Sequence, residues 1–180
     1  MLLAALAGLL HGQSGPDWDW QPGLFLSQPW RAWSAAAVHW SERHLLMNLG
    51  ACAVVGWLGW RADAGLRASL AWALAWPLTQ IGLLAQPGLL HYGGLSGVLH
   101  AGVAVLACLL WRERSGRERW LGAAFGAGLL LKILIEQPWA GPLRSVPGWD
   151  FALAPAAHAS GAVAGVLCAG LLLRRPPDAA

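Results

Sequence analysis

The sequence predicts an all-α protein that lies in a membrane and crosses it with six helices. Hydrophobic residues make up 57% of the 180 residues and charged residues only 12%, whereas a soluble domain carries about 25% charged residues. The apolar residues also gather in long runs, and a helix needs about 20 residues to cross a hydrocarbon core about 30 Å thick. We expect one membrane domain over residues 1–180, without a separate soluble domain.

Six apolar segments follow one another along the chain. They are residues 1–11, 42–60, 66–85, 92–111, 120–135 and 151–173. The second, third, fourth and sixth are long enough to span a bilayer. The first would reach only about 16 Å as a helix, so we interpret it as a short or truncated first helix. The fifth is also short, and its Lys132 can either snorkel to the interface or pair with Glu136 one turn further on.

The basic residues indicate which loops face the cytoplasm. Eight of the twelve Lys and Arg residues lie in the loops after the second and fourth segments or after the sixth. They are Arg61, Arg67, Arg112, Arg114, Arg117, Arg119, Arg174 and Arg175. The other four are Arg31, Arg43, Lys132 and Arg144. The positive-inside rule then places both termini in the cytoplasm. No nucleic-acid partner is expected, because the arginines form short loop clusters without a recognition motif.

Tryptophans crowd the first long loop, residues 12–41. They are Trp18, Trp20, Trp30, Trp33 and Trp40. Indole rings favour the membrane–water interface. We therefore expect this loop to lie against the outer membrane surface.

Polar side chains lie near the outer ends of three segments. His44 and Asn48 share one face of the second segment because they are four residues apart. Ser96 lies about one turn into the fourth segment, and His158 about two turns into the sixth. With a rise of about 1.5 Å per residue, all four fall at a similar depth in the outer half of the membrane. Because polar groups are costly in lipid, this coincidence predicts a functional site.

Ser96 and His158 are the expected catalytic residues. A serine hydroxyl is a weak nucleophile and needs an adjacent general base, and His158 can take its proton and return it to the leaving amine. Gly161 and Gly165 form a GxxxG pattern that allows close helix contact and could bring His158 against Ser96. No acidic residue lies at matching depth in this interpretation, so a dyad is expected. Asp150, just outside the sixth segment, is at most a weak orienting group.

Four further groups are expected to stabilise the tetrahedral intermediate or the substrate. The side chains of His44 and Asn48 and the backbone at Gly94 and Leu95 can donate hydrogen bonds to a developing oxyanion. His100 lies four residues after the serine, on the same helix face. It is either a rival base or a residue that supports the site, and we favour support.

These residues resemble the motifs of the rhomboid intramembrane serine proteases, most closely those of the rhombosortase branch. The fourth segment carries GLSG at residues 94–97, similar to the GxSG of that family. The second carries HLLMN at residues 44–48, similar to HxxxN, and the sixth carries AHASG at residues 157–161. The WR pair at residues 30–31 resembles the Trp-Arg pair of rhomboid first loops. His100, four residues after the serine, is similar to rhombosortases.

The resemblance implies a rhomboid-like six-helix bundle with serine endopeptidase activity in a bacterial inner membrane. Rhombosortases process exported proteins that end in a Gly-Gly motif, a hydrophobic helix and a basic tail. The implied partners are therefore the lipid bilayer and membrane-anchored proteins with a C-terminal hydrophobic helix, cut near the periplasmic face. No metal or organic cofactor is implied. The short first segment is the departure from the family pattern.

Two other classes of function use the same residues. A catalytically inactive rhomboid-like protein could bind membrane clients, although an intact Ser96 and His158 argue against it. A haem, metal or quinone protein could use His44, His100 and His158, and visible absorbance of the purified protein would reveal it. The peptidase is preferred because it gives the serine and the histidines one joint explanation.

Overall fold

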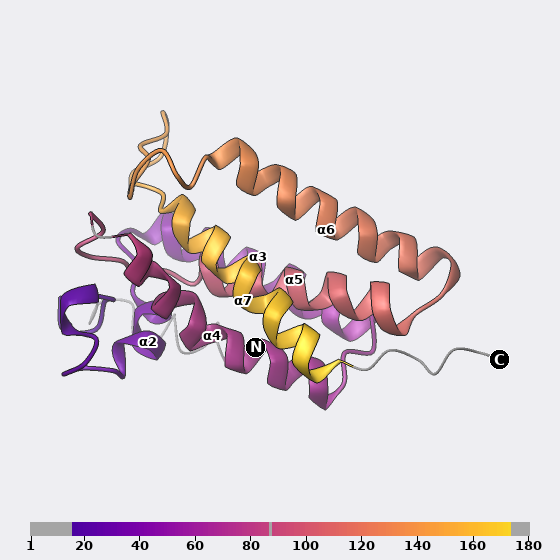
Figure 1. Ribbon diagram of the computed structural model, residues 1–180. Coiled ribbons are helices and arrows are strands. Elements are labelled where there is room, and N and C mark those ends of the chain that lie inside the picture. The colour runs from indigo at the N-terminus through magenta and orange to yellow at the C-terminus, as the bar shows by residue number, and fades with distance from the viewer. Residues whose placement is uncertain (1–15, 87, 174–180) are drawn as a thin grey trace.

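A computed structural model describes residues 16–86 and 88–173, and its regular structure is helical. In chain order the elements are η1 (Pro22–Leu24), α2 (Arg31–Ser34), η2 (Ala35–Ala37), α3 (Glu42–Arg61), α4 (Leu66–Ile81), η3 (Gly82–Ala85), α5 (Ser96–Glu113), α6 (Gly116–Glu136) and α7 (Pro155–Leu172). The five long helices, α3 to α7, run alongside one another between two ends of the molecule (Figure 1). The predicted all-α membrane bundle is confirmed for this part of the chain. The predicted first segment, residues 1–11, lies outside the described residues.

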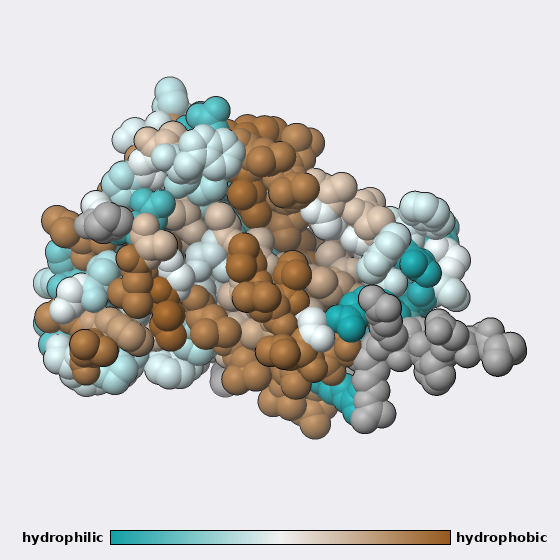
Figure 2. All heavy atoms as spheres, in the orientation of Figure 1, coloured by the Kyte–Doolittle hydropathy of each residue, from teal (hydrophilic) through white to brown (hydrophobic). Residues whose placement is uncertain are grey.

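Three of the described helical segments are long and apolar enough to cross a membrane, namely Leu66–Ala85, α5 and α7. Helices α3 and α6 have 20 and 21 residues, which is enough length to span, but they carry more polar and charged side chains. Hydrophobic residues cover the middle of the face in Figure 2, and hydrophilic residues gather mainly toward its ends. A bilayer requires this distribution, because charged groups are costly in its core.

The helix boundaries differ from the predicted ones at two places that matter for the site. Helix α5 begins at Ser96 itself, because Tyr92 is in extended backbone that pairs with Trp20 through two hydrogen bonds of 2.7 and 2.9 Å. Helix α7 begins at Pro155. Proline suits the first helical position because it has no N–H group, and an N–H there would have no partner within the helix. His158 therefore lies in the first turn of α7, and the expectation of two turns is wrong. Both catalytic candidates are nearer to the helix ends than predicted.

Glycines bring α5 and α7 into close contact. A Cβ atom on Gly161 would lie 1.9 Å from the carbonyl oxygen of Gly97, and one on Gly165 would lie 2.4 Å from that of Ala101. A side chain at either glycine would force the two helices apart. The prediction that the GxxxG pattern permits tight contact is therefore confirmed. On its other side α7 contacts α4, where the Ser160 hydroxyl donates to the carbonyl oxygen of Thr79 over 2.7 Å.

Helix α6 packs on α5 mainly at the end far from Ser96. A Cβ atom on Gly122 would lie 2.8 Å from the carbonyl oxygen of Ala107, and Gly122 is the buried residue of α6. Its other end finishes at Glu136, because Gln137 adopts the left-handed conformation, with φ of 53°, that commonly ends helices. The loop of residues 137–154 then leads to α7 at the same end as Ser96 (Figure 1).

A buried ion pair fixes the first loop. The Arg31 guanidinium lies 3.1 Å from a carboxylate oxygen of Asp19, which is fully buried. The other Asp19 oxygen lies 2.6 Å from Nδ1 of His91, just before α5. Residue Trp20 is also fully buried. The loop is thus an ordered element tied to the segment that leads to Ser96.

Candidate active site

Ser96 and His158 come from different helices and meet at the end of the bundle where α5 and α7 begin. The Oγ atom of Ser96 lies 3.0 Å from Nε2 of His158, a distance typical of a hydrogen bond. The close contact between Gly97 and Gly161 holds the two helix ends together. His158 is 5% exposed. The pair therefore has the geometry of a hydroxyl nucleophile beside its general base.

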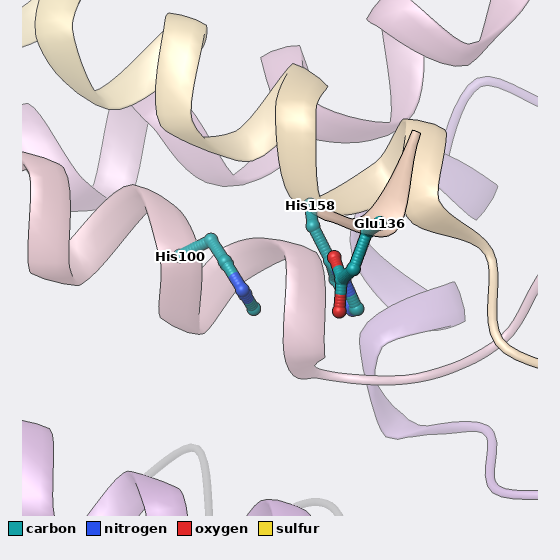
Figure 3. Close-up of side chains that lie close together, drawn as sticks. All are labelled: His100, Glu136 and His158. Carbon is teal, nitrogen blue, oxygen red and sulfur yellow. The ribbon is translucent and has the colours of Figure 1, made fainter. Parts of the chain in front are cut away.

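Glu136, the last residue of α6, binds the other nitrogen of the same imidazole. Its Oε2 lies 2.6 Å from Nδ1 of His158 (Figure 3). Its Oε1 accepts a hydrogen bond from Lys132, one turn earlier. The expectation that no acidic residue lies at this depth is wrong, and Asp150 is exposed. The missed signal was the Lys132 and Glu136 pair itself, because ionisable residues within an apolar helix are functional candidates by default.

His100 covers one face of the His158 ring. The two imidazoles are stacked, with centroids 4.1 Å apart and planes 8° apart. Nδ1 of His100 lies 2.7 Å from the carbonyl oxygen of Ser96 and donates to it, because a carbonyl can only accept. His158, and not His100, thus directs a ring nitrogen at the serine hydroxyl. The structure places His100 against the face of the His158 ring and beside the backbone of Ser96.

Three of these side chains offer ligand atoms that a metal ion could use. Atoms of His100, Glu136 and His158 all lie within 4.8 Å of one another. The stacked rings, however, keep the lone pairs of the two imidazoles in parallel planes. The imidazoles of His100 and His158 could not both coordinate one metal ion unless one of the rings rotated. The arrangement suits hydrogen bonding to His158 better than metal chelation.

The side chains of His44 and Asn48 both approach Gly94, two residues before Ser96. A Cβ atom on Gly94 would lie 2.8 Å from Nε2 of His44 and 3.9 Å from Nδ2 of Asn48. His44 Nδ1 accepts the backbone N–H of Trp40 over 3.4 Å, which leaves a proton on Nε2. The buried Nδ2 of Asn48 has no hydrogen-bond partner among the described residues. Both side chains therefore present donors to the space beside Gly94.

Gly94 itself serves a conformational purpose. Its φ of 135° is disfavoured for residues with a side chain. Its N–H donates to the carbonyl oxygen of Ala35 over 2.9 Å. Contrary to the expectation from the sequence, this amide is therefore not free to donate to an oxyanion. Its carbonyl oxygen accepts the Tyr92 hydroxyl over 3.1 Å, and burial raises the pKa of that phenol. Leu95 is buried and directly precedes α5.

The N-terminus of α5 adds a favourable field at the nucleophile. The first backbone N–H groups of a helix have no intrahelical partners and carry partial positive charge. Ser96 is the first residue of α5. The backbone at this end can therefore stabilise negative charge that develops next to its Oγ atom.

A small cavity opens at the serine. Its volume is about 30 Å³, and Ser96, His158, His44, Tyr92 and Phe151 are among the residues that line it. The Phe151 ring stacks on His44 with centroids 4.1 Å apart. A cavity of this size admits a water molecule but no large side chain.

The fold and the site together define a multi-pass helical membrane protein with a serine–histidine pair where two of its helices begin. The family model described as Rhomboid domain matches residues 26–175. This match covers most of the chain, and the protein belongs to the rhomboid family, a family of the intramembrane protease type whose members act on membrane proteins within the bilayer. A search of curated proteins finds no matching relative.

Proposed function

We propose that this protein is an intramembrane serine endopeptidase in which Ser96 is the nucleophile and His158 the general base and acid. The observation that carries the proposal is the 3.0 Å distance between Ser96 Oγ and His158 Nε2. The contact between Ser96 and His158 supports peptide-bond cleavage better than client binding alone, because binding needs no base aimed at a hydroxyl.

The first half of the reaction transfers an acyl group to the enzyme. Ser96 Oγ attacks the carbonyl carbon of the scissile peptide bond while its proton moves to Nε2 of His158. The resulting tetrahedral oxyanion collapses, the C–N bond breaks, and His158 gives the proton to the leaving amine. The products of this half are an ester on Ser96 and a free amino end on the C-terminal fragment.

The second half consumes one water molecule. His158 takes a proton from the water, whose oxygen attacks the ester carbonyl carbon. The tetrahedral intermediate then collapses, the bond to Ser96 Oγ breaks, and the proton returns to that oxygen. The N-terminal fragment leaves with a carboxylate. The cavity beside Ser96 has room for this water.

The proposed stabilisation of the oxyanion in both halves comes from three groups. Nε2–H of His44 and Nδ2 of Asn48 face the space beside Gly94, and the start of α5 contributes its partial positive charge. Donors fixed before the reaction stabilise charge that develops in the transition state without having to reorganise. Asn48 fits this role because its buried Nδ2 has no hydrogen-bond partner among the described residues.

The proposed substrates are exported proteins anchored by a C-terminal hydrophobic helix, cut at a Gly-Gly motif, as the resemblance to rhombosortases implies. The narrow cavity supports this choice, because glycine has no side chain to place there. The proposed location is a bacterial inner membrane, with cytoplasmic termini and a periplasmic site. In support, the Arg-rich turns after α3 and α5 lie at the end of the bundle away from Ser96 (Figure 1).

The test is cleavage, in reconstituted membranes, of a model protein that ends in a Gly-Gly motif, an apolar helix and a basic tail. Wild type and the control Ser69→Ala should cleave it, because Ser69 lies exposed near the start of α4. Ser96→Ala and His158→Ala should not. If neither wild type nor any variant cleaves the substrate, and wild-type Ser96 does not react with a fluorophosphonate, the protein is a client-binding rhomboid without peptidase activity.

A further inference from the structure

We propose that Glu136 is a positioning residue that converts the Ser96–His158 pair into a triad. It holds the His158 ring in the orientation and tautomer that a general base needs. This inference rests on the proposed peptidase function. It departs from the dyad that the sequence alone suggests, and it depends on the contacts of one carboxylate.

The tautomer follows from the two hydrogen bonds of His158. A carboxylate can only accept, so Nδ1, 2.6 Å from Glu136 Oε2, must carry the proton. Nε2 of the neutral ring then has a free lone pair, 3.0 Å from Ser96 Oγ, that accepts the serine proton. Without Glu136 the ring could also protonate at Nε2, and that tautomer cannot act as a base toward Ser96.

Burial makes the Glu136 contact strong. The Glu136 and His158 side chains are 13% and 6% exposed, and hydrogen bonds gain strength where the local dielectric constant is low. When His158 takes the serine proton, its positive charge forms directly against the carboxylate. The contact thus stabilises the protonated ring during reaction, as well as orienting the neutral ring beforehand.

Neighbouring cations hold Glu136 in place. Lys132 donates to its Oε1, which leaves Oε2 for His158. Arg144 donates from Nη1 to the backbone carbonyl oxygens of Ile135 and Glu136 over 3.1 and 3.4 Å. These carbonyls end α6 and lack intrahelical partners. Arg144, in the loop after α6, therefore fixes the backbone at Glu136, and Lys132 within α6 fixes the Glu136 side chain.

An ordinary helix-stabilising ion pair would not need this geometry. Exposed pairs four residues apart contribute only about 0.3–0.5 kcal/mol and tolerate many side-chain rotamers. Glu118, on the same helix, forms an exposed pair of this spacing with Arg114 in the turn before α6, at 3.8 Å and with its side chain 59% exposed. Glu136 differs because it joins α6 to a ring nitrogen on α7. Glu118→Gln is therefore a matched control for Glu136→Gln.

The experiment measures kcat and KM for the Gly-Gly model substrate in reconstituted membranes. Glu136→Gln should lower kcat at least 100-fold with less than a threefold change in KM, since a wrongly protonated base costs up to about 10⁴-fold in serine hydrolases. Glu136→Asp, which keeps the charge but shortens the reach, should recover part of that loss. Glu118→Gln should match wild type. Equal kcat for Glu136→Gln and wild type would overturn the proposal.

Two readouts separate positioning from a merely structural role. A loss confined to kcat, with KM nearly unchanged, shows that the variant still binds substrate. Partial recovery by Glu136→Asp shows that a carboxylate is what the position requires.

Misfolding of a variant and failure of the proposed peptidase function are detected by separate measurements. Circular dichroism and size-exclusion chromatography should be the same for wild type and Glu136→Gln. If that variant misfolds, Glu136→Asp carries the test, and a kcat equal to that of wild type in Glu136→Asp would overturn the proposal, because its shorter side chain should not reach His158 as Glu136 does. A wild type that neither cleaves nor reacts with a fluorophosphonate refutes the peptidase function. A wild type that cleaves, beside an equally active Glu136→Gln, refutes the triad alone.

Discussion

The imidazole rings of His100 and His158 lie face to face, with their centroids 4.1 Å apart and their planes 8° apart. His100 is anchored in this position by its bond to the carbonyl oxygen of Ser96. The stack limits the tilt of the His158 ring, and Glu136 accepts a hydrogen bond from Nδ1 of that ring. His100 thus belongs to the support of the base, which leads to a test that separates support from base chemistry.

His100→Phe should keep kcat within about tenfold of wild type, because a flat ring still covers His158. His100→Ala should lower kcat more, since it removes the stack and leaves a gap beside the base. Steady-state kinetics on the model substrate check this order. Loss of all activity in His100→Phe, with His158→Ala still active, would instead make His100 the base.

The contact of Gly97 with Gly161 predicts a strong effect of a single methyl group. Gly161→Ala places a Cβ 1.9 Å from a backbone oxygen, so α5 and α7 must separate, at a cost of about 1–3 kcal/mol for overpacking. Both the midpoint of thermal unfolding in detergent and kcat should fall, because the Ser96–His158 distance depends on this contact.

Gly170→Ala is the control for that change. It lies on the same helix, and the nearest atom to its added Cβ is the end of the Arg112 side chain at 3.9 Å. This variant should match wild type in both measurements. Equal stability of Gly161→Ala and wild type would mean that the two helices are not in such close contact.

Much of this arrangement could be predicted from the sequence because it depends on local patterns. Apolar length predicts the helices, and the GxxxG spacing at Gly161 predicts the approach of α7 to α5. The contact of Glu136 with His158 could not be predicted, because it depends on where α6 ends and how residues 137–154 return the chain. The start of α5 at Ser96 was missed for a similar reason, since Tyr92 pairs with a distant residue, Trp20.

Asn48 should matter for the reaction and little for stability. Its buried Nδ2 has no partner among the described residues, so Asn48→Ala removes no hydrogen bond at that atom from the folded protein. If Nδ2 donates to the oxyanion, kcat should fall about 10²–10³-fold, with KM nearly unchanged. Kinetics and thermal unfolding on the same samples check this. A large drop in stability with unchanged kcat would assign Asn48 to helix packing.

The cavity at Ser96 predicts which residue the enzyme accepts at the cleaved bond. Its volume of about 30 Å³ is bounded on one side by Phe151, whose ring is held by stacking on His44 and by an edge contact with Trp149, with centroids 5.2 Å apart. Substrates in which valine replaces a glycine of the Gly-Gly motif should lose at least tenfold in kcat/KM. Phe151→Ala should recover part of that loss, because it enlarges the cavity without touching Ser96 or His158.

The measurement is the ratio of kcat/KM for the glycine and valine substrates in each protein. A ratio near one in wild type would show that the cavity does not select the residue, and the Gly-Gly preference would then have to come from elsewhere in the substrate.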